Sequence, residues 1–311
     1  MATRQQWIDG ARPRTLPAAF SPVAIGTAIS VYETFLDGSL KPGMSFNPLL
    51  PILALVVALA LQIGVNYAND YSDGIRGTDE ERVGPVRLVG QGLAEPDEVK
   101  RAAFIAFGIA AVAGLLLTVL SQYWVLLPAG VLSILAAWFY TGGKRPYGYS
   151  GFGELFVFVF FGLVAVIGTS ASQTHHVTSL SIVGGVASGA FATALLVVNN
   201  LRDIPGDTLA GKKTLAVRLG DSRTRELYRI CILVAYFMPV AMFLLPSGPR
   251  YAYVALFTLM YARRPLMQIQ KDTHGPELIT VLVDTGRAQL MFSMILTIAI
   301  TASAWTPAVP S

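Results

Sequence analysis

Hydrophobic residues occur along the chain in nine long runs separated by shorter polar segments. A membrane-spanning helix needs roughly 20 mainly apolar residues. Runs of this kind cover residues 15–32, 48–69, 102–120, 123–140, 153–170, 180–200, 229–246, 250–268 and 287–305. The eighth run is interrupted by Arg263 and Arg264, so eight spans are also compatible with the pattern. The sequence predicts an all-α membrane protein, with nine transmembrane helices in a single domain over residues 1–311.

The composition agrees with a membrane location. Of the 311 residues, 53% are hydrophobic and only 14% are charged, whereas a soluble domain carries about 25% charged residues. These values exclude a disordered chain, a coiled coil and a secreted disulfide scaffold, and Cys231 is the single cysteine. The net charge of +4 does not indicate a nucleic-acid partner, because membrane proteins carry basic loops for topological reasons.

The charges are distributed asymmetrically about the predicted spans. Nine spans place the amino terminus and the loops after spans two, four, six and eight on one side, together with 21 of the 23 Lys and Arg residues. Only Lys41 and Arg250 fall on the other side. The positive-inside rule makes the rich side cytoplasmic, with the carboxyl terminus outside. The same side holds 17 of the 19 acidic residues, which that rule does not explain.

The first residues contain three arginines but no short apolar core before a cleavage site, so we expect an interfacial segment rather than a signal peptide.

Two acidic clusters stand where predicted helices reach the cytoplasmic side. The second run ends in NYANDYSDGIRGTD, in which Asn66, Asp70 and Asp73 share one face of a continuing helix. The sixth run ends in NNLRDIPGD, in which Asp203 lies four residues after Asn199 and Asp207 follows a Pro-Gly break. Carboxylates at membrane depth cost roughly 2.5 to 3.5 kcal/mol each. We therefore expect the two clusters, which resemble an internal repeat, to converge around a positive charge.

Oxygen ligands without His or Cys are typical of a Mg²⁺ site completed by substrate phosphates. Basic residues stand beside both clusters and indicate an anionic phosphate ligand. Arg76, Arg82 and Arg87 follow the first cluster, Arg202 lies inside the second, and Lys212 and Lys213 follow it. The loop after the fourth run, YTGGKRPYGYSGFGELF, adds Tyr140 and Lys144 at the same level. For any one basic residue alone, a topological charge is an equally simple interpretation, and a single Asp near the end of a span is more simply a helix cap or a solvated loop residue.

These segments resemble the UbiA-type intramembrane aromatic prenyltransferases, whose two aspartate-rich motifs bind Mg²⁺ and a prenyl diphosphate. The similarity extends from ARPRTLPAAFSPVAIG near the amino terminus to TGRAQL near Thr285. Within the family, GGKRPYGYSGFGELFVFVFFG and NNLRDIPGDTLAGKKTLAVRLG are most similar to the branch that prenylates 1,4-dihydroxy-2-naphthoate in menaquinone synthesis. The first motif departs from the NDxxDxxxD pattern of the 4-hydroxybenzoate branch, because Gly77 occupies the last Asp position and Asp79 follows. Whether Asp79 is a ligand stays open.

The resemblance implies nine helices around a central cavity with a polar cytoplasmic cap, in a bacterial cell (inner) membrane. It implies two Mg²⁺ ions, one held by Asn66, Asp70 and Asp73 and one by Asn199 or Asn200, Asp203 and Asp207. The residues that it implies as diphosphate or substrate contacts are Lys144, Arg202, Lys212 or Lys213, Asn69 and Arg76, and it implies that Tyr140 supports the allylic cation. The implied reaction joins a polyprenyl chain to the aromatic acid with loss of CO₂, giving demethylmenaquinol.

The carboxylate of a naphthoate must approach an already anionic diphosphate, so a nearby cation should offset the repulsion. Arg12 and Arg14 precede the first span on the cytoplasmic side and are candidates; topological charge alone explains them equally well. Other readings are another UbiA-type enzyme, such as a 4-hydroxybenzoate polyprenyltransferase, or a secondary transporter. Transporter sites lie near the bilayer midplane, whereas both acidic clusters stand at the cytoplasmic ends of predicted spans. A CDP-alcohol phosphatidyltransferase is disfavoured because its continuous DGxxAR motif is absent.

Overall fold

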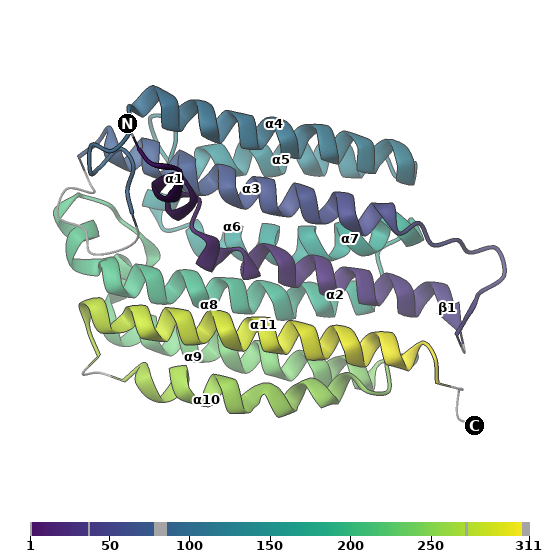
Figure 1. Ribbon diagram of the computed structural model, residues 1–311. Coiled ribbons are helices and arrows are strands. Elements are labelled where there is room, and N and C mark those ends of the chain that lie inside the picture. Colours follow the sequence, from purple (N-terminus) through teal and green to yellow (C-terminus); the bar gives the residue numbers. More distant parts are fainter. Residues whose placement is uncertain (1, 37, 78–85, 271–272, 307–311) are drawn as a thin grey trace.

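The computed structural model describes residues 2–36, 38–77, 86–270 and 273–306. Long helices run side by side through most of this chain (Figure 1). In order, the elements are α1 (Arg4–Gly10), the 3₁₀ helix η1 (Pro13–Thr15), α2 (Pro17–Thr34), β1 (Phe35–Leu36), β2 (Ser39–Leu40), α3 (Leu49–Gly74), α4 (Pro96–Ser121), α5 (Leu126–Phe139), η2 (Tyr147–Ser150), α6 (Gly153–Phe158), the π-helix η3 (Val159–Val164), α7 (Ala165–Thr174), α8 (Ser179–Leu209), α9 (Leu215–Leu244), η4 (Ala252–Thr258), α10 (Leu259–Gln268), η5 (Gly275–Glu277) and α11 (Leu278–Ser303). Asp79 and Arg82 lie outside the described residues.

Helical segments of the described chain occupy each of the nine predicted ranges. Six are long and apolar enough to cross a membrane. A seventh is counted when α2 and the preceding helical segment Arg4–Thr15 are taken as one span with a bend of 49° between them. The chain is therefore a multi-pass, all-α membrane protein. Because α5 has 14 residues and α10 has 10, both fall below the roughly 17 that a span requires. Nine crossings thus stay a prediction.

The two helices that carry the acidic clusters extend beyond their predicted ends. The α3 helix continues to Gly74, so that Asp70 and Asp73 are helical as expected. The predicted break at Pro205 and Gly206 is wrong, because α8 continues through both residues to Leu209 and includes Asp207. Proline has a helical φ and removes a single backbone hydrogen bond, which a helix near its end can accommodate.

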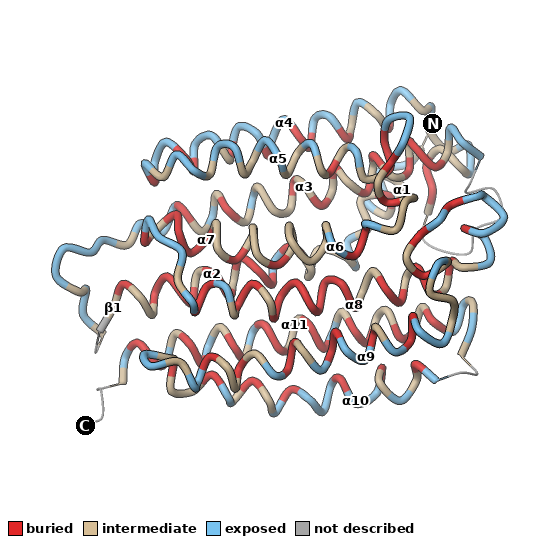
Figure 2. The backbone as a smooth tube through the Cα atoms, turned by 180° about the vertical axis from the view of Figure 1, so that it is seen from behind, coloured by how far each residue is buried: buried red, intermediate tan, exposed pale blue. Residues whose placement is uncertain are grey.

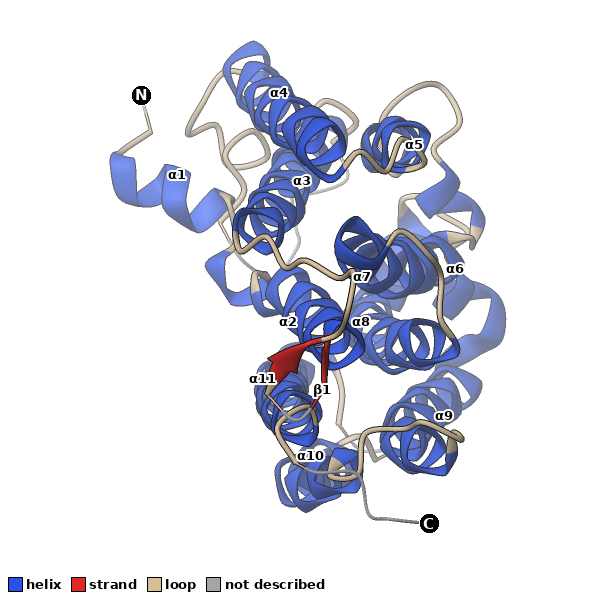
Figure 3. Ribbon diagram, turned by 90° about the vertical axis from the view of Figure 1, so that its right-hand side faces the viewer, coloured by secondary structure: helices blue, strands red, loops and turns tan. Residues whose placement is uncertain are grey.

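The helices form three groups in the end-on view (Figure 3). One group contains α3, α4 and α5, another contains α9, α10 and α11, and α2, α7 and α8 lie between them. The amino terminus and the carboxyl ends of α3 and α8 lie at one end of the bundle, whereas α11 ends at the other, beside the β1–β2 hairpin (Figure 1). Both acidic segments therefore reach the same end.

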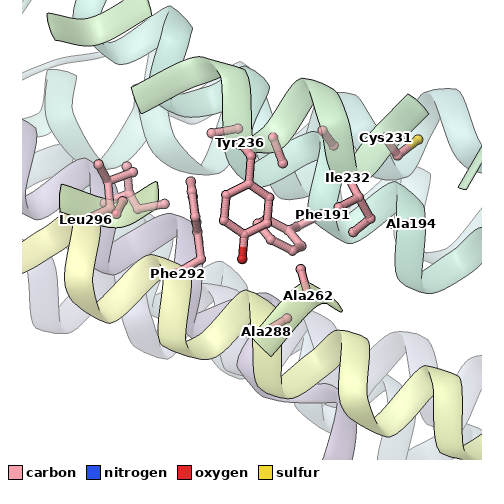
Figure 4. Packing of buried hydrophobic residues seen from close by; sticks show 14 of the residues in the cluster. Phe191, Ala194, Cys231, Ile232, Tyr236, Ala262, Ala288, Phe292 and Leu296 are labelled. Carbon is pink, nitrogen blue, oxygen red and sulfur yellow. The ribbon is translucent and has the colours of Figure 1, made fainter. Parts of the chain in front are cut away.

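Of the long helices in the described part of the chain, α8 is the most buried. Phe191 of α8, Tyr236 of α9 and Phe292 of α11 form a cluster with ring centroids 5.0 to 5.6 Å apart (Figure 4). Buried residues follow α8 along most of its length, whereas the outward faces of α4 and α10 are exposed (Figure 2). In a bilayer, close packing and interhelical hydrogen bonds hold helices together, because lipid tails are as apolar as the side chains.

Small residues bring α8 against the segment formed by α6, η3 and α7. A Cβ atom on Gly162 would lie 2.5 Å from the backbone of both Gly185 and Gly189, so only glycine fits there. The Ser188 hydroxyl donates to the carbonyl of Phe161 at 3.0 Å across the same contact. This close approach holds η3 against α8 at residues 185–189.

Candidate active site

Lys212 joins the two acidic segments. Its side chain is buried in the turn after α8, where the ammonium donates to Asp73 Oδ1 at 3.0 Å and lies 3.9 Å from Asp207 Oδ1. Asp73 comes from α3 and Asp207 from α8, so two helices distant in sequence share one cation. The neighbouring Lys213 is exposed. Of the two lysines considered from the sequence, Lys212 therefore lies between the clusters.

Tyr149 completes this group, and the sequence reasoning missed it. Its hydroxyl donates a hydrogen bond to Asp73 Oδ1, and its ring faces the Lys212 ammonium at 4.4 Å and the Arg76 guanidinium at 5.4 Å. Burial, followed by the negative charge of Asp73, raises the pKa of Tyr149, so that the phenol stays a neutral donor. The available signal was its position in the same polar loop as Tyr140 and Lys144.

The second cluster has its own ion pair. Arg202 forms a two-pronged contact with Asp203, with Nε and Nη2 lying 2.8 and 2.9 Å from the two carboxylate oxygens. The same Nη2 donates to Asn199 Oδ1 at 2.9 Å. Asn200 faces the other way, and its Nδ2 donates to Glu154 Oε1 of α6 at 2.9 Å. The two neighbouring asparagines therefore have different partners.

The three residues of the first cluster, Asn66, Asp70 and Asp73, contact different parts of the chain. Asn66 Nδ2 donates to the carbonyl of Ala11 at 2.9 Å and to the Thr15 hydroxyl at 3.1 Å, so it holds the amino-terminal segment. Asp70 is fully buried and accepts the backbone N–H groups of Leu88 and Val89 at 2.7 and 3.1 Å. In this arrangement Asp73 lies with the second cluster, whereas Asn66 and Asp70 bind adjoining chain segments.

The loop between α5 and α6 is tied to the end of α3. Arg76 donates to the carbonyls of Thr141 at 2.7 Å and Gly143 at 2.6 Å. Asn69 Oδ1 accepts the Thr141 hydroxyl at 2.7 Å. Asn69 and Arg76 therefore hold this loop beside the acidic group.

The remaining candidates lie around this group. Lys144 is exposed, while Tyr140 is half-buried, with its ring edge-on to Tyr147 at 5.5 Å. Arg12 is half-buried between α1 and η1, with a left-handed φ of 57°, and attracts the Asp70 carboxylate. Arg14 is exposed. Of the two amino-terminal arginines, Arg12 therefore lies within electrostatic reach of an acidic residue.

The donors suit a hard cation that arrives with a phosphate. Within the described ranges, no three His, Cys, Asp or Glu side chains come close enough to hold a metal by themselves. Asp73, Asp203 and Asp207 nevertheless provide carboxylates from two helices, and Lys212 occupies the position between two of them. Mg²⁺ usually binds through one or two carboxylates plus substrate phosphates. The residues therefore fit a metal–diphosphate site rather than a closed protein cage.

Comparison with known proteins identifies the family of this chain. Residues 34–277 match the UbiA prenyltransferase family. The chain is 50% identical to 1,4-dihydroxy-2-naphthoate octaprenyltransferase of Mycobacterium tuberculosis, over 94% of this chain and 96% of the relative. It is 36% identical to the Escherichia coli protein of the same name, over 97% and 96%. A UbiA homolog from Archaeoglobus fulgidus bound to GPP and Mg²⁺ shares the fold, with a TM-score of 0.67, 14% identity and coverage of 96% and 99%. The chain belongs to the UbiA prenyltransferase family.

Proposed function

We propose that this protein transfers a polyprenyl chain from polyprenyl diphosphate to 1,4-dihydroxy-2-naphthoate, with loss of CO₂, to give demethylmenaquinol. The observation that supports this most is Lys212 between Asp73 of α3 and Asp207 of α8, because it joins both acidic motifs at one end of the bundle. Near-full-length relatives at 50% and 36% identity carry the name of a naphthoate octaprenyltransferase. The polyprenyl tail explains the membrane location, since it needs a long apolar surface.

The chemistry follows from the development of charge. When the allylic C–O bond breaks, negative charge builds up on the leaving diphosphate, and a carbon of the electron-rich ring then forms the new C–C bond. Lys212 supplies a buried cation that stabilises the leaving group, since preorganised charges are most effective where water is excluded. Tyr149 and Arg76 hold the residues around it. The apolar interior of the bundle protects the allylic cation from water.

We propose that two Mg²⁺ ions bind with the diphosphate, held by Asp73 with Asn66 and Asp70 on one side and by Asp203 and Asp207 with an asparagine on the other. A bound divalent ion supplies Lewis-acid stabilisation of the charge on the diphosphate. Arg202 neutralises Asp203 before the substrate arrives. Asp70 would have to exchange its two backbone hydrogen bonds for a metal contact. Asp73 and Asp207 already lie beside the Lys212 ammonium, and Asp73 also accepts the Tyr149 hydroxyl.

We assign recognition of the acceptor carboxylate to Arg12 rather than Arg14. Arg12 is half-buried near Asp70, whereas Arg14 is exposed. Replacement of Arg12 with Gln should raise the KM for the aromatic acid more than the KM for the prenyl diphosphate, because it weakens binding of one substrate only. Arg14→Gln is the matched control. Equal KM values in both variants would remove Arg12 from this role.

We also propose that the end of the bundle with the acidic motifs faces the cytoplasm, with the amino terminus inside and the carboxyl terminus outside. The distribution of 21 of the 23 basic residues supports this orientation.

A direct experiment incubates the detergent-purified protein with Mg²⁺, a polyprenyl diphosphate and either 1,4-dihydroxy-2-naphthoate or 4-hydroxybenzoate. We expect a prenylated product and release of CO₂ with the naphthoate only, and loss of both in EDTA. Prenylation of 4-hydroxybenzoate alone would show that the branch is wrong, although the metal chemistry would stand. Full activity in EDTA would contradict the metal-assisted reaction.

A further inference from the structure

An open groove follows the outer face of α4, a helix at the edge of the bundle (Figure 3). One part of it, with a volume of about 530 Å³, lies between α4 and α3. A second part of about 580 Å³ continues toward the amino-terminal end of α4, and Ile105 lines both. Residues that line the α4 groove are three or four positions apart and so form one stripe along the helix: Asp97, Arg101, Ile105, Ile109, Val112 and Leu116.

The first part of the α4 groove is apolar, and its floor contains a glycine. Ile105, Ile109 and Val112 are each more than half exposed. A Cβ atom added to Gly108 would have open space around it for 4 Å, so the helix backbone is uncovered at this point. Val56 of α3 belongs to the opposite wall. These surfaces fit a hydrocarbon chain, which at this depth belongs to a lipid.

Aromatic and basic side chains mark the level of the lipid headgroups. The Lys100 ammonium lies 5.5 Å from the centre of the Tyr71 ring. The Trp138 ring stacks on Tyr71 and lies 4.8 Å from the ring of Phe104, which lines the second part of the groove. Trp and Tyr are enriched at the interface between membrane and water. Lys100 and the exposed Arg101 therefore stand at headgroup level, where the apolar part of the groove ends.

One turn further from the bilayer, the α4 groove ends at an acidic residue. Asp97 precedes Lys100 by about 4.5 Å and Arg101 by about 6 Å along the helix axis, and all three line the same part of the groove. Glu98 of the same turn accepts the backbone N–H of Glu95 and closes the capping box. From the membrane outward, the groove is thus first apolar, then positive and then negative.

We propose that the α4 groove binds one phosphatidylethanolamine molecule of the leaflet at the end of the bundle with the acidic motifs. The acyl chain lies along residues 105–116, the phosphate beside Lys100 and Arg101, and the ammonium beside Asp97. The headgroup of this lipid has the same order of charges, with the phosphate next to the glycerol and a primary ammonium at the tip. Phosphatidylglycerol has no cation for Asp97, and the ammonium of phosphatidylcholine has no N–H to donate. The proposal does not depend on the reaction that the protein catalyses.

Photo-crosslinking tests the location of the lipid. The full-length, detergent-purified protein is mixed with phosphatidylethanolamine that carries a diazirine in one acyl chain, irradiated and digested, and the labelled peptides are identified by mass spectrometry. We expect label on residues 53–56 of α3 and 105–116 of α4, displaced by unlabelled phosphatidylethanolamine and not by the same concentration of phosphatidylglycerol. Label spread evenly over the exposed apolar helices, or displaced by a polyprenyl diphosphate at that concentration, would overturn the proposal.

Native mass spectrometry of the same protein tests the order of charges. Lys100→Gln combined with Arg101→Gln should raise the Kd for phosphatidylethanolamine about 30-fold, since each basic residue near a lipid phosphate contributes about a factor of five. Asp97→Asn should raise the Kd for phosphatidylethanolamine and lower it for phosphatidylglycerol, because the acid attracts an ammonium and repels an anion. Gly108→Leu fills the floor of the groove and should weaken both lipids about tenfold through lost contacts with the acyl chain.

Arg223→Gln and Gly130→Leu are the matched controls. Arg223 is an exposed basic residue of α9, and Gly130 of α5, like Gly108, has open space for 4 Å around an added Cβ atom. Both controls should keep the Kd for phosphatidylethanolamine within about twofold of the wild type. A wild type that prefers phosphatidylglycerol, or an unchanged preference in Asp97→Asn, would overturn the choice of lipid. Equal Kd values for Gly108→Leu and Gly130→Leu, or a dimer of the wild type that Gly108→Leu dissociates, would show that the lipid does not occupy the groove.

Discussion

Replacement of Lys212 with Met tests the link between the two acidic segments. The Lys212 ammonium lies 3.0 Å from Asp73 and 3.9 Å from Asp207, and all three side chains are less than 10% exposed. At an effective dielectric constant of about 20, Coulomb's law gives about 5 kcal/mol of attraction at the shorter distance. The cost of desolvating the ions offsets part of this attraction. Removing one partner of a buried pair is expected to cost about 3 to 5 kcal/mol.

Two measurements separate the structural role of Lys212 from its chemical role. Without metal, Lys212→Met should unfold at a lower temperature than the wild type, because Asp73 and Asp207 lose their shared cation. Added Mg²⁺ and diphosphate should restore more stability to the variant than to the wild type, since a metal can replace the missing charge. Steady-state kinetics at saturating Mg²⁺ should show kcat reduced about 10² to 10³-fold, as for the loss of one group that stabilises developing charge.

Lys213→Met is the matched control. Lys213 is adjacent in sequence, has the same charge and is exposed, so its replacement should change stability by no more than about 0.5 kcal/mol. If Lys212→Met keeps the kcat of Lys213→Met, the buried lysine does not assist departure of the diphosphate. If it also keeps the metal-free unfolding temperature, the ion pairs that join α3 to α8 contribute nothing measurable.

Two further predictions concern contacts of the site, and a third concerns the membrane topology. Asp70→Asn should lower the unfolding temperature, by an amount equivalent to about 1 to 3 kcal/mol, because an amide cannot accept both loop N–H groups that the carboxylate now accepts; an unchanged thermal unfolding curve would contradict this. Because the pKa of Tyr149 is raised by burial and by Asp73, the phenol should keep donating above the pH of about 10 at which an ordinary tyrosine ionises. Tyr149→Phe should reduce kcat without changing the alkaline limb of the pH profile, and a limb that disappears in the variant would show that Tyr149 titrates there. Reporter fusions at Ser222 and Ser311 should report opposite sides of the membrane, whereas matching signals would mean an even number of crossings between them.

The sequence by itself determined the class of protein and the location of its chemistry. Long apolar runs predict helices in lipid because every backbone polar group must be satisfied within its own segment, and this requirement is local. The ends of α3 and α8 were recognisable because aspartates such as Asp73 and Asp207 are costly at membrane depth without a function. The charge asymmetry placed both segments at the same side, and the structure brings them to one end of the bundle (Figure 1).

Only the tertiary structure decided which side chains meet. Lys212 and Lys213 are the same residue type at adjacent positions, so the sequence does not distinguish them. The turn after α8 buries Lys212 and exposes Lys213. Helical periodicity placed Asp70 on the same face as Asp73, but the loop at residues 88 and 89 folds over Asp70 and occupies both of its oxygens. Tyr149 lies in the loop between α5 and α6, and helical periodicity does not predict its hydrogen bond to Asp73. These contacts join segments far apart in sequence, and their geometry depends on how the whole bundle packs, so local spacing could not predict them.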